Sequence, residues 1–318
     1  MTDSSTNDYQ MDTNQTSDQH QIDADRPTDG KQMDTDEPPK EEQIDRHYDD
    51  DRQSVAVAAA LAGGSVARSF FRTAVTESNK RGVGPAINPG DIVTTADRHA
   101  QDAAVATINA RFPDDTIVGE EGDLPKRVPE QGFVWVIDPI DGTYNFARGA
   151  IGWTCSVAVL QDGRPIHAVN TAPAVSDTYT VSDGVVTRNG SPVTVSDRND
   201  PKLAAVAAMG LPDFGHREAY ANSVSQLLLQ FGNLRRIGSA QLTLSLVASG
   251  ALDGAVTAYP LSPWDTIAGV ELVRAAGGCV TDIDGSGWSW ETPGLVASNG
   301  QIHEDLLTSV KLMSNRDS

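Results

Sequence analysis

FVWVIDPIDGTYNF, from Phe133 to Phe146, is the stretch of sequence from which the fold follows. It opens with an uninterrupted run of apolar, β-branched and aromatic residues, 133–137. A run of this kind between turn signals predicts a buried strand. Asp138 follows the run, and Asp141 comes three residues later. We therefore expect two carboxylates to be held at the end of a rigid strand.

Two carboxylates in this position suit a hard divalent cation. Mg²⁺ prefers oxygen ligands and usually binds through a few carboxylates together with phosphate oxygens. Pro139 stiffens the turn between the two aspartates. Gly142 leaves its own amide and the amide of Thr143 open to a phosphate group. The alternative is a strand that ends in an acidic turn and binds nothing.

The charge of the chain is strongly negative and unevenly distributed. The net charge is −20 over 318 residues, and residues 1–51, with 16 acidic and 4 basic residues, carry −12 of it. Lys is rare, with 6 residues against 18 Arg. An acidic, Lys-poor surface suits a protein that stays hydrated at high salt, so we expect a halophilic source. The same acidity argues against nucleic-acid binding, which requires basic patches.

Two cysteines, Cys155 and Cys279, lie far apart in apolar runs, and the chain has no Cys-x-x-Cys pair or Cys/His cluster. Neither a disulfide framework nor a zinc site is indicated. No apolar stretch reaches the length of a membrane span, and the first residues lack the apolar core of a signal peptide. We expect a cytoplasmic protein that does not bind membranes.

The pattern of the chain predicts an acidic tail followed by two lobes. Residues 1–51 contain almost no large apolar side chains, cannot offset the entropy of ordering, and are expected to be disordered. An Ala-rich helical pattern begins near Arg52, and its glycine pair 63–64 would weaken the helix unless another backbone packs closely there. We assign residues 52–200 to an N-terminal lobe with most of the candidate ligands, and residues 201–318 to a C-terminal lobe.

A second acidic group precedes the central stretch. A short extended segment ends near Asp97, which could cap the helix that follows. Residues 116–119 predict another strand, and Glu120 and Glu121 stand at its end. Acidic residues at two successive strand ends are what a metal cluster at one sheet edge would need. Glu121 is expected to be an exposed neighbour of the ligands.

The rest of the chain predicts antiparallel strands and then helices. Asp-Gly pairs at 162–163 and 183–184 are hairpin signals between alternating segments. The loop 238–240 leads into a predicted helix, and Pro263 suits the first turn of another. Asp265 in that turn would ordinarily interact with the helix dipole.

Three separated segments resemble the inositol monophosphatase family, which also includes archaeal enzymes that hydrolyse fructose 1,6-bisphosphate. They are GEEG at 119–122, DPIDGTYNF at 138–146 and PWDTIAGVELVRAAGG at 263–278. The resemblance covers about residues 52–318. It implies an α+β fold of the sugar-phosphatase type, with layers in the order α/β/α/β/α, and an archaeal source is in keeping with it.

The resemblance implies two or three Mg²⁺ ions in one active site. One ion would be held by Glu120, Asp138 and the backbone carbonyl of Ile140, and a second by Asp138, Asp141 and Asp265. Independently of the resemblance, so many carboxylates in one place would repel one another strongly without cations. A joint role without metal is therefore disfavoured.

The resemblance also implies the residues that act on the substrate. Thr143, with Glu120, would orient the attacking water, and Asp97 would support the water shell of the ions. The amides of Gly142 and Thr143 would receive the phosphate. The loop Gly238-Ser239-Ala240 matches the substrate loop of the family. Because family members are commonly dimers, a homodimer is expected.

Several positions depart from the pattern of the inositol-specific relatives. Those relatives place a Glu seven residues and a His three residues before the aspartate of the last motif, where this chain has Ala258 and Ser262. Gln241 stands where a small residue is usual, and Tyr144 also replaces a smaller residue. We therefore expect intact phosphate chemistry with an alcohol pocket that is not that of an inositol specialist.

These observations favour a Mg²⁺-dependent phosphatase that acts on inositol monophosphate, fructose 1,6-bisphosphate or both. The first alternative is a nucleotide 3′-phosphatase of the 3′-phosphoadenosine 5′-phosphate type, whose members usually carry a longer insert around the first motifs. The second is a non-catalytic sugar-phosphate-binding protein, which the loss of a ligand would mark, and none is lost. An oxidoreductase and a serine hydrolase are disfavoured, because G-x-G-x-x-G after a strand and G-x-S-x-G are absent.

Overall fold

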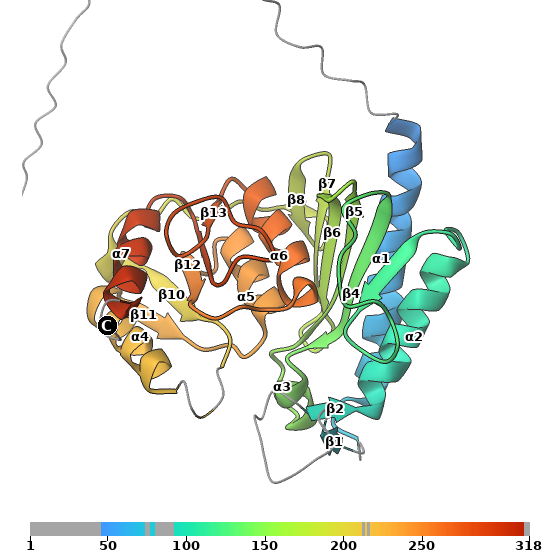
Figure 1. The fold of residues 1–318 in the computed structure, drawn as a ribbon, viewed down its shortest axis with the longest axis horizontal. Coiled ribbons are helices and arrows are strands. Elements are labelled where there is room, and N and C mark those ends of the chain that lie inside the picture. The colour runs from blue at the N-terminus through green and yellow to red at the C-terminus, as the bar shows by residue number, and fades with distance from the viewer. Residues whose placement is uncertain (1–45, 74–76, 80–91, 212–213, 215–216, 315–318) are drawn as a thin grey trace, which may run out of the picture. The chain divides into compact units, whose positions relative to one another are not determined.

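The apolar and alternating segments between residues 116 and 192 form one sheet of seven strands (Figure 1). Neighbouring strands follow chain order, and all pairs are antiparallel except β3 and β4. The turns at 162–163 and 183–184 have positive φ at both residues, which confirms the two predicted hairpins. The strands are β3 (Thr116–Gly119), β4 (Phe133–Asp141), β5 (Thr154–Gln161), β6 (Arg164–Ala172), β7 (Asp177–Ser182), β8 (Val185–Arg188) and β9 (Ser191–Pro192).

The C-terminal part forms a second sheet of five strands, in the order β11-β10-β12-β14-β13. Helical connections make β10, the second strand in this order, parallel to both of its neighbours, whereas β14 is antiparallel to β12 and β13. A separate antiparallel pair consists of β1 (Glu77–Asn79) and β2 (Ile92–Thr94). The strands of the second sheet are β10 (Ala205–Ala208), β11 (Asn233–Arg235), β12 (Gly254–Thr257), β13 (Cys279–Thr281) and β14 (Leu295–Ser298).

Helices alternate with the two sheets (Figure 1). Helices α1 and α2 cover the outer face of the seven-stranded sheet, α5 and α6 lie between the sheets, and α4 and α7 cover the five-stranded sheet from outside. This arrangement confirms the expected α+β fold with its α/β/α/β/α layers. The helices are α1 (Arg46–Phe70), α2 (Thr95–Asn109), α3 (Thr143–Ala147), α4 (Arg217–Gln230), α5 (Ala240–Ala248), α6 (Pro263–Ala275) and α7 (His303–Ser314).

The structure is a computed structural model that describes residues 46–73, 77–79, 92–211, 214 and 217–314. Most of the predicted tail therefore lies outside the described residues. Helix α1 begins at Arg46, so it extends into the segment that the sequence assigned to the tail. None of the helices in the described ranges is both long and apolar enough to cross a membrane.

The apolar core occupies the spaces between successive layers. Buried side chains of the two sheets meet α5 and α6 in the middle, and smaller clusters lie under α1 and α2 and under α4 and α7. Fully buried residues include Leu160, Leu244 and Leu272 in the middle cluster, Ile108 and Trp135 under α1 and α2, and Leu227 and Leu306 under α4 and α7.

The glycine pair in α1 marks its closest approach to the sheet. A Cβ on Gly63 would lie 2.9 Å from Sγ of Cys155, and a Cβ on Gly64 would lie 2.8 Å from Cγ2 of Thr171. The predicted close packing against another backbone is therefore present, since a Cβ on Gly63 would also lie 3.0 Å from the carbonyl oxygen of Ala100. Burial beneath this helix raises the pKa of the Cys155 thiol to about 12.

Near the start of α1, Arg52 is enclosed by aromatic rings and a carboxylate. Its guanidinium donates to both oxygens of Asp115, with N–O distances of 3.1–3.2 Å. Its Cζ lies 4.2 Å from the ring centroid of Phe112 and 3.4 Å from that of Phe133. Asp115 also accepts a hydrogen bond from Nε1 of Trp135 at 2.9 Å. These contacts join α1 to β4 and to the turn before β3.

We predict that Asp115→Ala lowers the free energy of unfolding by about 3–5 kcal/mol, because it leaves the Arg52 charge buried without its partner. Both side chains of this pair are largely buried, with relative exposures of 7% and 13%. Urea unfolding followed by circular dichroism measures the loss. Asp51→Ala is the control, since the side chains of the Asp51–Arg111 pair are 53% and 63% exposed and its loss should cost less than about 1 kcal/mol. Equal losses in the two variants would contradict this account.

Candidate active site

A bulge at the end of β4 places two carboxylates on the same side of the strand. Three steps along β4, from Asp138 to Asp141, correspond to two steps along β5. In a regular strand, side chains three residues apart point to opposite faces, and the extra residue restores them to one face. Pro139, which has no N–H to donate, lies within this irregular segment. Oδ1 of Asp138 accepts the N–H of Ile140 at 3.0 Å, which holds the carboxylate in place.

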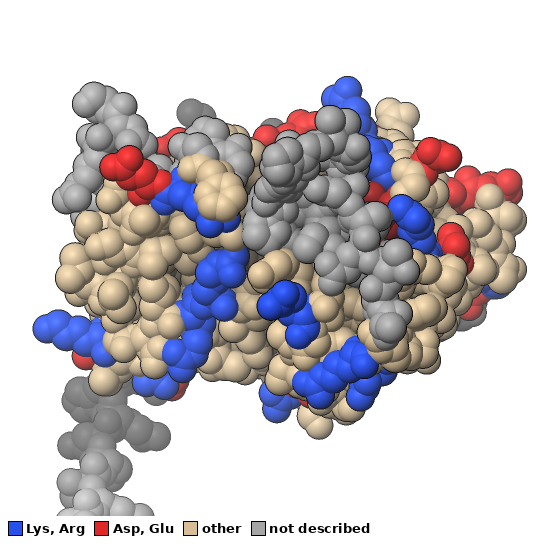
Figure 2. Space-filling view, turned by 90° about the horizontal axis from the view of Figure 1, so that it is seen from below, with Lys and Arg blue, Asp and Glu red and all other residues tan. Residues whose placement is uncertain are grey.

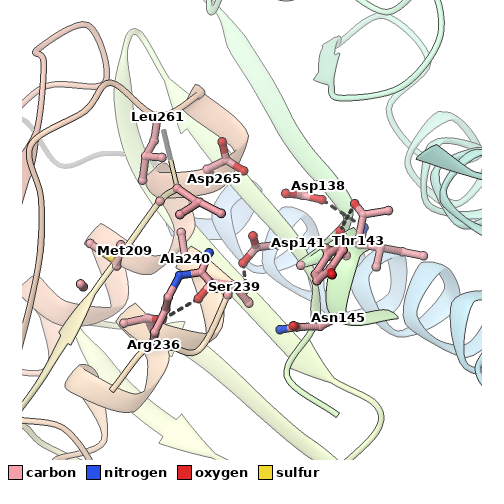
Figure 3. Close-up of a pocket in the computed structure, with 18 of the residues that line it drawn as sticks. Asp138, Asp141, Thr143, Asn145, Met209, Arg236, Ser239, Ala240, Leu261 and Asp265 are labelled. Carbon is pink, nitrogen blue, oxygen red and sulfur yellow. Dashed lines mark hydrogen bonds between the residues drawn. The ribbon is translucent and has the colours of Figure 1, made fainter. Parts of the chain in front are cut away.

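A third carboxylate reaches the same place from helix α6. Asp265 lies in the first turn of α6, where its Oδ2 accepts the N–H of Ser262 at 3.0 Å. Figure 3 shows Asp265, Asp138 and Asp141 converging on one space. One carboxylate oxygen from each of the three residues lies within 4.8 Å of the others. The group is shielded from solvent, since Asp138 and Asp141 are 1% and 6% exposed.

The parallel pairing of β3 and β4 brings Glu120 to this edge of the sheet. Residue 119, the last of β3, is the register partner of residue 137, so Glu120 follows the strand beside Asp138. Glu120 lines the same cavity as the three aspartates, although its carboxylate is outside the closely spaced group. Nζ of Lys126 donates to the carbonyl oxygens of residues 119–121 at 2.6–3.3 Å, and so it fixes the turn that carries Glu120.

The expectation that Glu121 is exposed is wrong. Its relative exposure is 6%. Gln101 of α2 accepts the backbone N–H of Glu121 and donates to its carbonyl oxygen, both at 2.9 Å. This pair of bonds holds the backbone against α2 and leaves the side chain buried. The sequence carried no signal for it, because Gln101 is twenty residues away.

Thr143 and Asp97 form a pair behind the cavity. Asp97, in the first turn of α2, is fully buried. Oγ1 of Thr143 lies 3.3 Å from Oδ1 of Asp97 and 3.1 Å from the carbonyl oxygen of Ile140. Thr143 is the donor in both hydrogen bonds. The single hydroxyl proton is thus directed away from the cavity, and the lone pairs of Oγ1 are available there.

Asp141 connects β4 to the start of α5. Its Oδ2 accepts hydrogen bonds from Oγ of Ser239 at 2.5 Å and from the backbone N–H of Gln241 at 2.6 Å, at the start of α5. The pKa of Asp141 is raised to about 6, first by burial and to a smaller extent by the charge of Glu120, although the hydrogen bonds from Ser239, Gln241 and Ala240 oppose this shift. The cost of burial therefore exceeds the gain from the hydrogen bonds.

Gly142 permits the close approach of the substrate loop. Its φ is +94°, a left-handed value that favours glycine. A Cβ at this position would lie 2.9 Å from the carbonyl oxygen of Gly152 and 3.1 Å from that of Gly238. A side chain here would therefore separate the end of β4 from the loop 238–240.

A single cavity of about 320 Å³ brings the candidate site residues together. It is lined by Glu120, Asp138, Ile140, Asp141, Gly142, Thr143, Gly238, Ser239, Ala240 and Asp265, so that every candidate except Asp97 is on its wall. The cavity wall also contains residues that the sequence did not indicate, among them Met209, Leu261, Arg217 and Arg236. Only the pair of arginines that precedes the substrate loop, at 235–236, was a visible signal. Tyr144 is 42% exposed at the same wall, and the structure suggests no role for it.

Three of the departures noted in the sequence do not line the cavity. Gln241 is fully buried between layers, where it donates to the carbonyl oxygen of Trp264 at 2.6 Å and accepts the N–H of Gly269 at 2.7 Å and of Asn170 Nδ2 at 3.0 Å. Ala258 packs against the apolar cluster under α4 and α7, and Ser262 holds the start of α6. Gln241 is therefore a structural residue, contrary to the expectation that it shapes the alcohol pocket.

The residues of the cavity fit a hard divalent cation. Three carboxylate oxygens within 4.8 Å of one another repel by about 3 kcal/mol per pair at an effective dielectric constant of about 20. A cation between them would replace this repulsion by attraction. All three donors are oxygen atoms, and no Cys or His belongs to this group in the described part of the chain.

Comparisons with known proteins agree with this geometry. Residues 49–314 match the model of the inositol monophosphatase family. The chain is 35% identical over 260 residues to the Nus factor SuhB of Pseudomonas aeruginosa, covering 80% of this chain and 93% of that protein. It is 33% identical over 221 residues to a fructose-1,6-bisphosphatase/inositol-1-monophosphatase of Thermotoga maritima, covering 69% and 82%. The solved structure of an inositol monophosphatase of Thermotoga maritima superposes with a TM-score of 0.74 at 29% identity, covering 84% and 100%.

We predict that protonation of Asp141 stabilises the metal-free protein. Its folded pKa, about 6, lies above the ordinary value of 3.8, so the carboxylate destabilises the fold once it ionises. The destabilisation grows as the pH rises from about 4 to about 6, is constant above that range, and disappears as the pH falls below 4. Asp141→Asn keeps an acceptor for Ser239 and Gln241 but cannot ionise. Between pH 4.5 and pH 7, the stability of the chelator-treated protein should fall by about 2 kcal/mol more than that of Asp141→Asn, as measured by urea unfolding. If the stabilities of the two proteins change in parallel with pH, the assignment of the raised pKa to Asp141 is wrong.

Proposed function

This chain belongs to the inositol monophosphatase family, and we propose that it is a Mg²⁺-dependent phosphatase that hydrolyses phosphate monoesters of small polyols or sugars. The convergence of Asp138, Asp141 and Asp265 on a cavity that Thr143 also lines carries the proposal. Inositol monophosphate and fructose 1,6-bisphosphate are the substrates that the names of relatives suggest.

The side chains divide into metal ligands and groups that position the reactants. Glu120, Asp138, Asp141 and Asp265, with the carbonyl of Ile140, would hold the cations. Bound Mg²⁺ would lower the pKa of a coordinated water and shield the charge of the phosphate and of the leaving oxygen. Because none of the candidate metal ligands is replaced, the ligand set supports catalysis rather than simple binding.

Thr143 and Asp97 supply the proton relay in this proposal. Asp97 accepts the hydroxyl proton of Thr143, so Oγ1 of Thr143 can accept a proton from the attacking water. Full burial of Asp97 keeps its carboxylate fixed behind the threonine. The amides of Gly142 and Thr143, at the wall of the cavity, would bind the phosphate oxygens.

An experimental test must distinguish the proposed function from two alternatives. A nucleotide 3′-phosphatase would use the same carboxylates on a larger alcohol. A non-catalytic role is suggested by the relatives named as Nus factor. Phosphate release from inositol, fructose, histidinol and adenosine phosphates, with Mg²⁺ and at low and high KCl, distinguishes them. Release from none of these esters would contradict the proposed function.

We predict that Asp138→Asn and Asp265→Asn each lower kcat by about a thousandfold, because metal charge stabilisation contributes several kcal/mol to the transition state. Folding stability without metal should not fall, since each change removes one charge from a like-charged group. Asp305→Asn, at an exposed position on α7, is the control and should retain turnover. Near-normal turnover of both site variants would show that the ligand assignment is wrong.

We also predict weak selectivity for inositol 1-phosphate. Apart from the four candidate metal ligands, no carboxylate lines the cavity within the described residues, so no acidic side chain remains to accept bonds from inositol hydroxyls. Such an acceptor contributes about 1.5–3 kcal/mol. The ratio of kcat/KM for inositol 1-phosphate to that for glycerol 2-phosphate should therefore stay below about a thousandfold. A larger ratio would refute this reading of the alcohol pocket.

A further inference from the structure

Gln241 connects two of the candidate ligands, although its side chain does not line the cavity. Its backbone N–H donates to Oδ2 of Asp141 at 2.6 Å. Its side-chain Nε2 donates to the carbonyl oxygen of Trp264, the residue before Asp265, also at 2.6 Å. One residue of α5 therefore contacts the ligand on β4 directly and the turn of α6 that carries the other ligand.

The side-chain amide of Gln241 has one orientation that satisfies its neighbours. Oε1 accepts the N–H of Gly269 at 2.7 Å and a hydrogen bond from Nδ2 of Asn170 at 3.0 Å, whereas Nε2 faces the carbonyl oxygen. The reversed amide would place Nε2 against two donors and Oε1 against an acceptor. Trp264 and Gly269 stand on either side of Asp265 in the sequence of α6. The amide therefore holds the helical turn that begins at Asp265.

The packing around this amide leaves it little freedom. Gln241 is fully buried. A Cβ on Gly269 would lie 2.6 Å from Cβ of Leu244 and 2.8 Å from Oε1 of Gln241, so the absence of a side chain at Gly269 permits this close approach of α5 and α6. In a contact this close, the amide cannot move without displacing one of the helices. The spacing between Asp141 and Asp265 is therefore set before a cation binds.

The surface near the site contributes little to the attraction of a cation. Helix α3, whose first residues line the cavity, lies at the face shown in Figure 2. Lys and Arg side chains gather on the described part of this face although the whole chain carries −20, and Asp and Glu side chains lie mostly towards its edges. Such a surface does not attract cations over a distance. The affinity for a cation must then depend on the spacing of the carboxylates themselves.

We propose that Gln241 is a positioning residue that sets the spacing between Asp141 and Asp265 and thereby favours Mg²⁺ over larger divalent cations. The inference rests on the proposed function, because it takes the carboxylate group to be a cation site. Mg²⁺ requires a nearly ideal octahedron with ligand distances of about 2.0–2.1 Å, whereas Ca²⁺ accepts about 2.3–2.6 Å and a flexible geometry. Ligands held at a spacing suited to the smaller ion disfavour the larger one, and loosened ligands accept both.

Thermal unfolding at increasing concentrations of Mg²⁺ and, separately, of Ca²⁺ tests the proposal. A cation that binds only the folded protein raises the Tm according to its Kd, so both affinities can be measured without substrate. Gln241→Met keeps a side chain of similar length but removes the three hydrogen bonds of the amide. We expect the Kd for Mg²⁺ to rise about tenfold, as is typical when residues that hold metal ligands are changed, and the Kd for Ca²⁺ to change little. An unchanged ratio of the two Kd values would overturn the proposal.

Ser245→Ala is the matched control. Ser245 lies one turn further along α5, is fully buried, accepts a hydrogen bond from Asn170 at 2.9 Å and donates to the carbonyl oxygen of Gln241 at 2.8 Å. Its loss should lower the Tm of the metal-free protein but leave the ratio of the Kd values unchanged, because none of its side-chain hydrogen bonds among the described residues reaches α6 or Asp141. An equal shift of the ratio in this variant would show that general loosening, and not Gln241, is responsible.

Asn170→Ala provides a second variant if Gln241→Met does not fold. It removes one donor to Oε1 of Gln241 and leaves the bonds to α6 in place. The ratio of the Kd values should shift in the same direction as in Gln241→Met, by a smaller factor. If the ratio in Asn170→Ala equals that in Ser245→Ala, the proposal is overturned.

Turnover assays distinguish a positioning role from a direct role in catalysis. Gln241→Met retains every candidate ligand, so it should need about tenfold more Mg²⁺ for half-maximal turnover, whereas kcat at saturating Mg²⁺ should recover. A kcat that stays low at every Mg²⁺ concentration would contradict the positioning role. If the unmutated protein binds Mg²⁺ but hydrolyses no ester, the proposed function fails, and the Kd ratio still decides this inference. If Mg²⁺ does not raise the Tm of the unmutated protein, the cation site and this inference fail together.

Discussion

Mutual repulsion among buried carboxylates is the constraint on which the rest of this structure depends. Asp138 and Asp141 come from β4 and Asp265 comes from α6, yet one carboxylate oxygen of each lies within 4.8 Å of the others. Backbone N–H groups of Ile140, Gln241 and Ser262 donate hydrogen bonds to these carboxylates and lower the cost of burying them, but burial still raises the pKa of Asp141. A fold that keeps such a group is one whose stability and activity are both tied to a bound cation.

The same group joins β4 of the seven-stranded sheet to the helices α5 and α6. Asp141 belongs to β4 but accepts hydrogen bonds from the start of α5, and Gln241 in that first turn binds both β6 and α6. The site is therefore not an addition to a finished scaffold. Changes in the packing between the sheets would displace Asp265 and the substrate loop relative to β4. This explains why Gly142 and Gly269, where a Cβ would meet neighbouring atoms at 2.6–2.9 Å, occupy the contacts between these elements.

Local sequence features predicted much of the fold and the ligands on β3 and β4. Hairpin turns, strand ends and the glycine pair in α1 depend on neighbouring residues, and the structure agrees with them there. The bulge that turns Asp138 and Asp141 to one face depends on pairing with β5, which no local pattern shows. Glu121 and Gln241 were misjudged because their hydrogen-bond partners are twenty or more positions away. The predicted start of α1 was also displaced along the sequence. Arg52 is held in place by Asp115, a residue of a distant turn that no local pattern shows.

The close contact of α1 with the sheet has a practical consequence for chemical labelling. Cys155 is sealed beneath Gly63, with no exposed surface and a thiol that stays protonated at neutral pH. Its only companion in the sequence is Cys279, which is partly accessible. A maleimide dye would therefore attach to one defined position of the native protein without any engineered cysteine. A second equivalent of dye would be taken up only when α1 lifts from the sheet, so the stoichiometry of labelling over time would report the opening of this layer.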